Sequence, residues 1–386
     1  MLRWRKVKAT VIYPSTYLQK STIALFCTCL LLFLSSCQSI TGSTTGPAVK
    51  NSTHPAPSPS ARTSPTPFQF PHQATTPTST PAPSINTNHP VLAFYYMWYA
   101  STDWCSCHMS DLPTIQYNSS DNATITRQVT WAAKAGITGF ISSWWGAGDK
   151  TDRNFATLLA DSATLERSTG YHFAPAVYIE NNAHALLNTT NMINALQYVT
   201  THYANDPHYF HWHGKPVIFF TSPITGNGRT LSTWAFIRSQ VDPHNQMIWS
   251  AEGVDTSVLS VFDGIHLFSA GYWGILNGDM AAVDQEFRNK IDAYNSAHHV
   301  QKIWAAGVLP GYDDTRVPGR KGTYIVPRNS GATYHTSWMA AISSNPDWIT
   351  ITTFNEWFEG AMIEPSIHYG NLYLDLTVQY AKLWHG

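Results

Sequence analysis

The sequence predicts an α/β fold, a (β/α)8 TIM barrel, between Val91 and Gly386. Short apolar runs without helical periodicity recur eight times, as expected of strands buried on both faces. Helix-like stretches separate most of these runs, and the alternation continues over about 300 residues, the size of one such barrel. An open doubly wound sheet is the structural alternative, but no Gly-x-Gly-x-x-Gly phosphate loop follows any of the runs.

The expected elements follow one another in regular order. The expected strands are the eight apolar runs at Val91–Tyr99, Ile137–Trp145, His172–Ile179, Pro216–Thr221, Gln246–Ser250, Gly264–Phe268, Lys302–Val308 and Trp348–Phe354. The expected helices are Ala123–Ala135, Asp152–Ser168, Thr190–Ala204, Leu231–Gln240, Met280–Ala297, Tyr334–Ser343 and, closing the chain, Asn371–Leu383. The crossover after the fifth strand is the weakest, because Gly253–Ser260 offers barely one turn of helix.

Aromatic and polar residues recur where the predicted strands end. In a barrel the carboxyl ends of the strands meet at one mouth, where active sites form. Tyr and Trp rings at such a mouth suit stacking on sugar rings. We expect sugar contacts there from Tyr96, Trp145, Tyr272 and Arg316, and substrate binding from Tyr312. Glu180, directly after the third strand, is either an acceptor of substrate hydroxyls or a solvated loop carboxylate.

The last strand leads into a turn that carries the candidate catalytic residues. Glu356 and Glu359 are three apart, a spacing that in a helical turn puts both on one face, roughly 5–6 Å apart at Cβ. Retaining sugar hydrolysis uses two carboxyls about 5–5.5 Å apart. A solvated acidic turn is the alternative, since such pairs are common on surfaces. Asn355 is expected to orient Glu356 or bind a hydroxyl, and Trp357 to bind substrate.

Other chemistries lack their motifs. The sequence contains neither the His-Glu-x-x-His ligand pair of a zinc hydrolase nor a Gly-x-Ser-x-Gly nucleophile turn. The formal net charge of −1 offers nothing to attract nucleic acid. We therefore expect carboxylate chemistry without a metal or cofactor, and no nucleic-acid partner.

The first 37 residues have the pattern of a targeting signal. A basic start (Arg3 to Lys8) precedes an apolar run, and Leu34-Ser35-Ser36-Cys37 has the form of a lipobox. We expect a bacterial lipoprotein signal peptide at 1–37, with Cys37 lipidated; an uncleaved membrane anchor is the alternative. Both place the rest of the chain outside the cytoplasm, attached to the cell membrane.

Residues 38–90 are rich in Pro, Ser and Thr and are expected to form a disordered linker, followed by the catalytic domain at 91–386. Only Cys105 and Cys107 fall in the folded part. A local disulfide, suited to an oxidising compartment, is favoured over a metal site, because a second ligand pair is missing. We assign this disulfide no role.

Four segments together resemble one known family. Thr353–Pro365, TFNEWFEGAMIEP, is similar to the signature S-F-N-E-W-H-E-G-T-Q-I-E of the endo-α-mannosidases of glycoside hydrolase family 99. Three further segments resemble it in family order: Phe94–Tyr99, Gly139–Gly146 and Pro310–Arg316. The likeness extends from about Val91 to the C-terminus. Phe358 stands where the family has His, and Ala361-Met362 where it has Thr-Gln.

The resemblance implies a retaining, endo-acting hydrolase that cleaves α-mannosidic linkages in glycans or mannans. Glu359 is then the general acid, and Glu356 a base on the sugar's own 2-hydroxyl, through a 1,2-anhydro sugar. The sequence is equally compatible with direct attack by Glu356. A non-catalytic, lipid-anchored glycan-binding barrel and an endo-α-glucanase of the mutanase type are the alternatives. The expected partner is an oligo- or polysaccharide, and the expected state is a monomer.

Overall fold

The computed structural model describes residues 89–224, 229–275 and 278–386. The predicted signal peptide, its lipidation site Cys37 and the linker up to residue 88 lie outside the described residues. Within the described ranges no helix is both long and apolar enough to cross a membrane.

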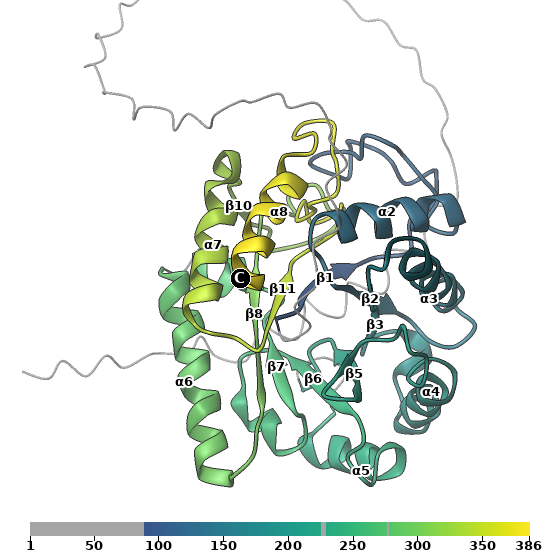
Figure 1. Ribbon diagram of the computed structural model, residues 1–386, viewed down its shortest axis with the longest axis vertical. Helices are drawn as coiled ribbons and strands as arrows, with labels where there is room; N and C mark the ends of the chain where they lie inside the picture. Colours follow the sequence, from purple (N-terminus) through teal and green to yellow (C-terminus); the bar gives the residue numbers. More distant parts are fainter. Residues whose placement is uncertain (1–88, 225–228, 276–277) are drawn as a thin grey trace, which may run out of the picture. The chain divides into compact units, whose positions relative to one another are not determined.

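Eight parallel strands close into a barrel, as predicted (Figure 1). In chain order they are β1 Val91–Tyr95, β2 Gly139–Trp144, β3 Ala176–Ile179, β5 Lys215–Phe220, β6 Ile248–Glu252, β7 Gly264–His266, β8 Ile303–Val308 and β11 Trp348–Ile351. Each pairs with its neighbour in the chain, β11 pairs with β1, and the Tyr178–Phe219 register joins β3 to β5. The (β/α)8 prediction is confirmed.

Helices separate most of the strands and lie outside the barrel (Figure 1). They are α2 Asn122–Lys134, α3 Lys150–Thr169, α4 Thr189–His202, α5 Leu231–Val241, α6 Met280–His298, α7 Ala332–Ser343 and α8 Leu372–His385. The weak crossover after β6 contains only the short 3₁₀ helix η3, Thr256–Ser260. The expected helices are therefore confirmed within a few residues at each end.

The strands lack polar alternation because both of their faces are covered. Every residue of β1, β2, β8 and β11 is buried. Inside the barrel the Phe94 ring lies 5.0 Å from Tyr178 and 5.6 Å from His266. Burial lowers the pKa of His266 to about 3, so this imidazole is a neutral core residue. The barrel interior is therefore packed, and open space is left to its mouth.

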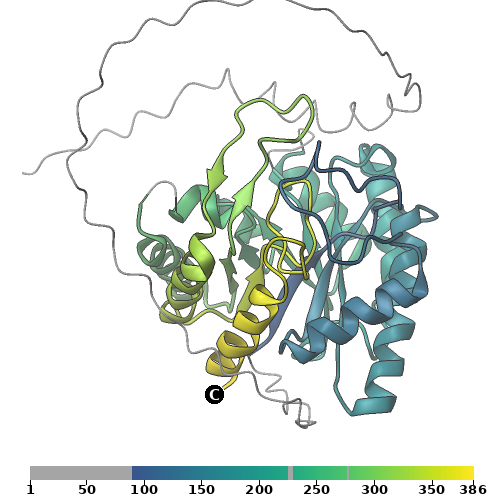
Figure 2. The same cartoon turned by 90° about the horizontal axis from the view of Figure 1, so that it is seen from above.

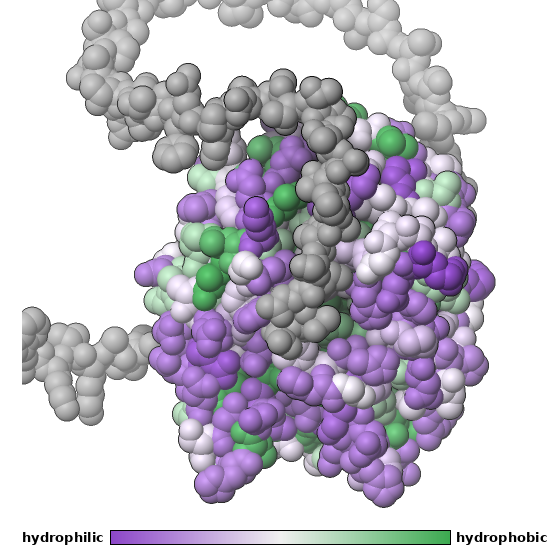
Figure 3. All heavy atoms as spheres, viewed as in Figure 1, coloured by the Kyte–Doolittle hydropathy of each residue, from purple (hydrophilic) through white to green (hydrophobic). Residues whose placement is uncertain are grey.

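Two irregular segments surround the mouth. One is residues 96–121, between β1 and α2; the other follows β8 and contains an antiparallel hairpin of β9 Tyr312–Asp313 and β10 Ile325–Val326. Figure 2 shows this hairpin, in yellow-green, projecting beyond the ends of the barrel strands. The coloured part of the face in Figure 3 is mostly hydrophilic with scattered apolar residues.

Candidate functional site

Four glutamates converge at the mouth from three strand ends. Glu180 follows β3, Glu252 ends β6, and Glu356 and Glu359 lie in the turn after β11. They influence one another electrostatically: Glu252 and Glu359 both act on Glu180, and Glu359 acts on Glu252 and Glu356. The predicted pair is therefore part of a larger cluster of acidic side chains at the barrel mouth.

Glu180 and Glu252 are each anchored through one oxygen. The Ser143 hydroxyl donates to Glu180 Oε1 at 2.7 Å, and the backbone N–H and hydroxyl of Ser222 each donate to Glu252 Oε2 at 2.9 Å. The other oxygen of each accepts no hydrogen bond from the described residues. Burial raises the pKa of Glu180 to about 8. The hydrogen bond from Ser143 lowers this pKa, and the charge of Glu252 raises it further. Burial raises the pKa of Glu252 as well.

Glu356 likewise accepts hydrogen bonds through only one of its two carboxylate oxygens, among the described residues. Its Oε1 accepts from the Tyr99 hydroxyl at 3.3 Å and from the Phe358 N–H at 3.2 Å, and no described group donates to Oε2. The Tyr99 hydroxyl also accepts from the Trp357 N–H, so it fixes the turn and the carboxylate together. Burial, and next the charge of Glu359, raise the pKa of Glu356 well above its usual range. Of the two carboxyls, Glu356 is therefore the one whose charged form its surroundings disfavour.

Asn355 fastens this turn to the first strand of the barrel. Its side-chain oxygen accepts from the Tyr96 N–H at 2.7 Å, and its nitrogen donates to the Tyr96 carbonyl at 2.8 Å. Asn355 and Tyr96 are 259 positions apart in the chain. Since Asn355 is fully buried, it orients the turn in this structure and has no surface for a sugar hydroxyl.

Trp357 is also fully buried, and its indole N–H donates to Glu364 at 3.0 Å. Glu364 accepts two further bonds, from the Tyr117 hydroxyl at 2.9 Å and the Gln128 amide at 2.7 Å. Trp357 thus packs in the interior and stabilises the turn. Its ring has no exposed surface for the substrate contact that was predicted for it. Burial raises the pKa of Glu364 to about 7, although the three hydrogen bonds that it accepts each lower this pKa.

Glu364 yields a stability prediction. Replacing Glu364 by Ala leaves the buried donors of Gln128, Tyr117 and Trp357 without their acceptor. At about 1–3 kcal/mol for each unsatisfied group, partly offset by entering water, we expect the free energy of unfolding to fall by about 3 kcal/mol. Denaturant unfolding measures this, with the exposed Glu286→Gln as control. Unchanged stability would show that the buried network carries little energy.

Glu359 differs from Glu356 in its partner. Arg320 Nη1 lies 2.9 Å from Glu359 Oε1 and 3.0 Å from Asp314 Oδ2. Glu359 lines a cavity of about 70 Å³, together with Tyr312, Tyr324 and five residues nearer the strands: Phe268, Ser269, Gly271, Leu309 and Thr352. A cavity of that size holds a few water molecules rather than a drug-sized ligand.

An aromatic wall stands beside the acids at the ends of β1 and β2. Trp98 lies between its neighbours, with ring centroids 4.6 Å from Tyr96 and 5.8 Å from Trp145. The Trp145 indole donates to the Ser143 hydroxyl at 3.1 Å, which in turn holds Glu180. Burial and then Glu356 raise the pKa of Tyr96 far above its usual value, so this phenol is neutral beside the pair. The structure thus brings Tyr96, Trp145 and Glu180 together with the catalytic candidates.

The remaining predicted residues belong to the hairpin side of the mouth. Tyr312 stacks on Tyr324 with centroids 4.4 Å apart, and the half-exposed Tyr272 lies 5.9 Å from the same ring. Arg316 instead donates to the carbonyls of Ser106 and Met109 at 2.9 and 3.1 Å. Arg316 therefore joins two loops of the mouth.

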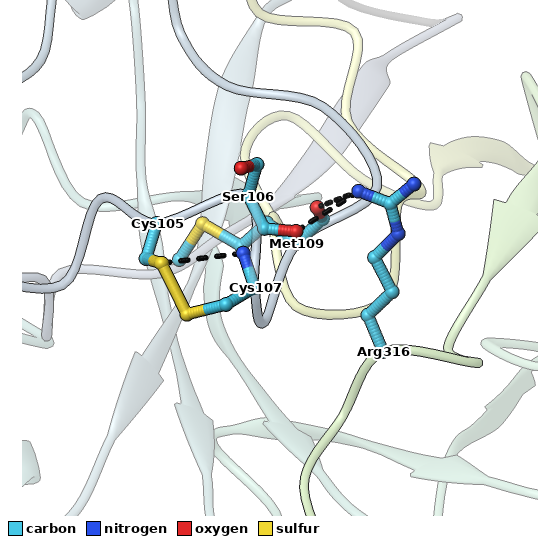
Figure 4. Close-up of a disulfide and its surroundings, with 5 residues drawn as sticks. All are labelled: Cys105, Ser106, Cys107, Met109 and Arg316. Atoms are coloured by element: carbon cyan, nitrogen blue, oxygen red, sulfur yellow. Dashed lines mark hydrogen bonds between the residues drawn. A yellow bond between two sulfur atoms is a disulfide. The ribbon is translucent and has the colours of Figure 1, made fainter. Parts of the chain in front are cut away.

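The loop to which Arg316 donates its hydrogen bonds contains the expected disulfide, Cys105–Cys107 (Figure 4). The bond closes a turn of three residues, and Arg316 approaches from the hairpin side. Within the described ranges, no group of three or more His, Cys, Asp or Glu side chains is placed to hold a metal ion. The two cysteines are thus part of a covalently closed loop at the mouth.

Two residues at the mouth, Glu252 of the acidic cluster and Arg320 beside it, were not predicted as site residues. Glu252 had an available signal, since it ends a buried strand at the mouth. Arg320 had none, because it lies in irregular backbone between β9 and β10, 39 residues before the carboxylate it contacts. Periodicity does not indicate the partner of such a loop side chain.

Comparison with known proteins identifies a family to which the chain is similar. The model of the family described as Glycosyl hydrolase family 99 matches residues 100–378. The glycoprotein endo-alpha-1,2-mannosidase of Mus musculus is 24% identical over 295 residues, covering 69% of this chain and 62% of the relative. The glycoprotein endo-alpha-1,2-mannosidase-like protein of Danio rerio is 37% identical over 135 residues, covering 31% and 29%. The chain thus spans less than two thirds of the length of these curated relatives.

Among solved structures, the GH99 endo-alpha-mannosidase from Bacteroides thetaiotaomicron, in complex with BIS-TRIS-propane, superposes with a TM-score of 0.64. It is 23% identical in sequence, and the match covers 78% of this chain and 98% of that one. At this level of identity the likeness supports the barrel fold, independently of the strand pairing described above.

Proposed function

The chain belongs to glycosyl hydrolase family 99, a family of glycoside hydrolases, and on this premise we propose that it is a retaining endo-α-mannosidase. The proposed substrate is an oligo- or polysaccharide with internal α-mannosidic linkages, as the names of the mannosidase relatives suggest. The observation that carries the proposal is the electrostatically coupled pair Glu356 and Glu359 at the barrel mouth, each with one oxygen that accepts no hydrogen bond from the described residues.

In the proposed first step, Glu359 gives its proton to the glycosidic oxygen as the bond to the anomeric carbon breaks. Glu356 takes the proton of the sugar's 2-hydroxyl, whose oxygen closes on the anomeric carbon and forms a 1,2-anhydro sugar. In the second step water opens this ring; Glu359 accepts a proton of the water, and Glu356 returns its proton to the 2-oxygen. The raised pKa of Glu356 suits a base, because its carboxylate holds an abstracted proton firmly.

The surrounding groups fit a hydroxyl-rich ligand. The free oxygens of Glu180 and Glu252 are acceptors for sugar hydroxyls, and the partly exposed Trp98 and Trp145 offer aromatic surface beside them. Phe358 stacks on Tyr99 with centroids 5.7 Å apart, at the position where the family signature has His. We expect this apolar ring to alter which sugar is accepted next to the cleaved bond.

A substrate panel tests the proposal. Purified protein is expected to release oligosaccharides from α-mannans, with the α-configuration retained in the first product seen by NMR. α-Glucans are the matched control: their cleavage instead would favour the mutanase-type alternative. Binding of mannan without release of any product would favour a glycan-holding barrel.

The cellular placement stays a proposal from the sequence. The basic start, apolar run and lipobox support export and lipid attachment of Cys37 to the cell membrane, with a linker that spaces the barrel from the surface. A monomer is the proposed state. Metabolic labelling with a fatty-acid analogue, compared between the wild type and Cys37→Ala, tests the attachment.

A further inference from the structure

The contact between Arg320 and Glu359 is enclosed. Only 10% of the Arg320 side chain and 14% of the Glu359 side chain are exposed. The same Arg320 nitrogen also lies 3.0 Å from Asp314 Oδ2 and 3.0 Å from the Tyr312 hydroxyl. An arginine keeps its charge in such surroundings, and the two carboxylates stabilise that charge. Arg320 is therefore held on Glu359 by the hairpin that carries it.

The same hairpin closes the space in front of Glu359. Tyr312 and Tyr324, which flank Arg320 in sequence and stack on each other, both line the cavity of about 70 Å³. Ligand pockets are several times larger, on the order of 300 Å³ and above. A sugar ring therefore enters at Glu359 only if side chains of the hairpin move.

This contact conflicts with the role proposed for Glu359. A general acid needs a proton, whereas a guanidinium at 2.9 Å stabilises the unprotonated carboxylate. The neighbouring Glu356 is in the opposite situation, buried and with its charge next to that of Glu359. In the empty site the pair's proton thus belongs on Glu356, although the reaction needs it on Glu359.

We propose that Arg320 is a positioning residue that resolves this conflict. It holds Glu359 as a carboxylate while the site is empty, and incoming substrate displaces it. The pair's single proton then passes from Glu356 to Glu359, which leaves Glu356 as the base and Glu359 as the acid, with no net proton uptake. This inference rests on the proposed hydrolase function.

Other groups around Glu359 do not supply this switch. The acids that act on it are Glu180, Glu252 and Glu356. The phenols that face it are Tyr96, Tyr178, Tyr312 and Tyr324, and burial first and nearby carboxylates second raise the pKa of each, so they stay neutral. Arg320 is the cation in contact with Glu359 among the described residues.

The pH dependence of Arg320→Gln tests the proposal. The alkaline limb of kcat/KM reports loss of the pair's proton in the free enzyme, and that of kcat reports it in the complex. Without Arg320 the free pair holds its proton more tightly, so we expect the kcat/KM limb to move up by about one to two pH units. The kcat limb is expected to stay within a few tenths of a unit, because substrate has already displaced Arg320. Arg320→Lys, which keeps the charge, should restore most of the wild-type profile.

Lys321→Gln is the matched control, since it removes a positive charge from the next, exposed position of the same loop. It is expected to move neither limb. Equal movement of both limbs in Arg320→Gln would mean that Arg320 stays on Glu359 in the complex and would overturn the displacement. No movement of either limb would overturn the charge-holding role.

A second measurement depends neither on activity nor on the folding of Arg320→Gln. In wild-type protein with ¹³C-labelled glutamate carboxyls, the Glu359 and Glu356 signals are assigned by their loss in Glu359→Gln and Glu356→Gln. Without substrate we expect Glu359, beside Arg320, to be the ionised member of the pair and Glu356 the protonated one; the reverse would overturn the proposal. If this pattern is found but no glycan is cleaved, the hydrolase proposal fails while the resting role of Arg320 stands.

Discussion

Replacing Glu359 by Gln is expected to abolish hydrolysis of natural mannans while the fold stays intact. Gln cannot give a proton to the departing sugar oxygen, and a positioned general acid contributes about 10²–10⁴ in rate. This corresponds to about 3–5 kcal/mol of transition-state stabilisation. The fold is expected to survive because Arg320 keeps its contact with Asp314 at 3.0 Å.

The dependence on the leaving group makes this test specific. An aryl mannoside-type substrate with a good leaving group needs no proton in the first step. The kcat/KM of Glu359→Gln, which reports that step, should therefore fall far less on this substrate than on mannan, whereas kcat stays low because Glu359 also accepts the proton of water in the second step. Glu286→Gln, on the exposed face of α6, is the control for loss of a carboxylate and should behave as wild type. Undiminished turnover of mannan by Glu359→Gln would remove this residue as the acid.

Replacing Glu356 by Gln is expected to lower kcat by a similar factor of about 10²–10⁴, for good and poor leaving groups alike, because the attack step itself is impaired.

In the wild type, kcat/KM is expected to fall as pH rises through the raised pKa of the pair, since the pair then loses the proton that the general acid donates. Initial rates across pH on both substrate types measure this. A loss restricted to poor leaving groups would instead exchange the roles of the two glutamates.

A 2-deoxy-2-fluoro mannoside separates the two possible roles of Glu356. It has no 2-hydroxyl, so it cannot form a 1,2-anhydro sugar, and we expect intact-protein mass spectrometry to show no adduct. A covalent adduct that maps to Glu356, and is absent from Glu356→Gln, would establish direct nucleophilic attack. The retained stereochemistry alone does not distinguish the two routes.

The strand order and the location of the candidate acids could be predicted from the chain alone. Runs such as Trp348–Phe354 are apolar on both faces, and in a barrel such runs are necessarily central strands, which puts the glutamates that follow them at the mouth. Glu356 and Glu359 were predicted as candidates in this way, from their place after the last strand and from the family-like motif. Asn355 and Trp357, for which substrate contacts were predicted, are fully buried in the structure, because adjacency to a candidate catalytic residue does not determine which side of the turn a side chain faces.

The sequence by itself therefore determined the barrel, which segments are buried strands, and the position of the turn that carries the two glutamates. The reason is that the pattern of apolar residues reflects burial directly, and the strand ends follow from that pattern. Only the tertiary structure decided how those acids are held. Asn355 meets Tyr96 across 259 positions, and Arg320 meets Glu359 from an irregular loop. The charge state of each glutamate depends on these partners and on desolvation, and both arise only when distant loops pack together at the mouth.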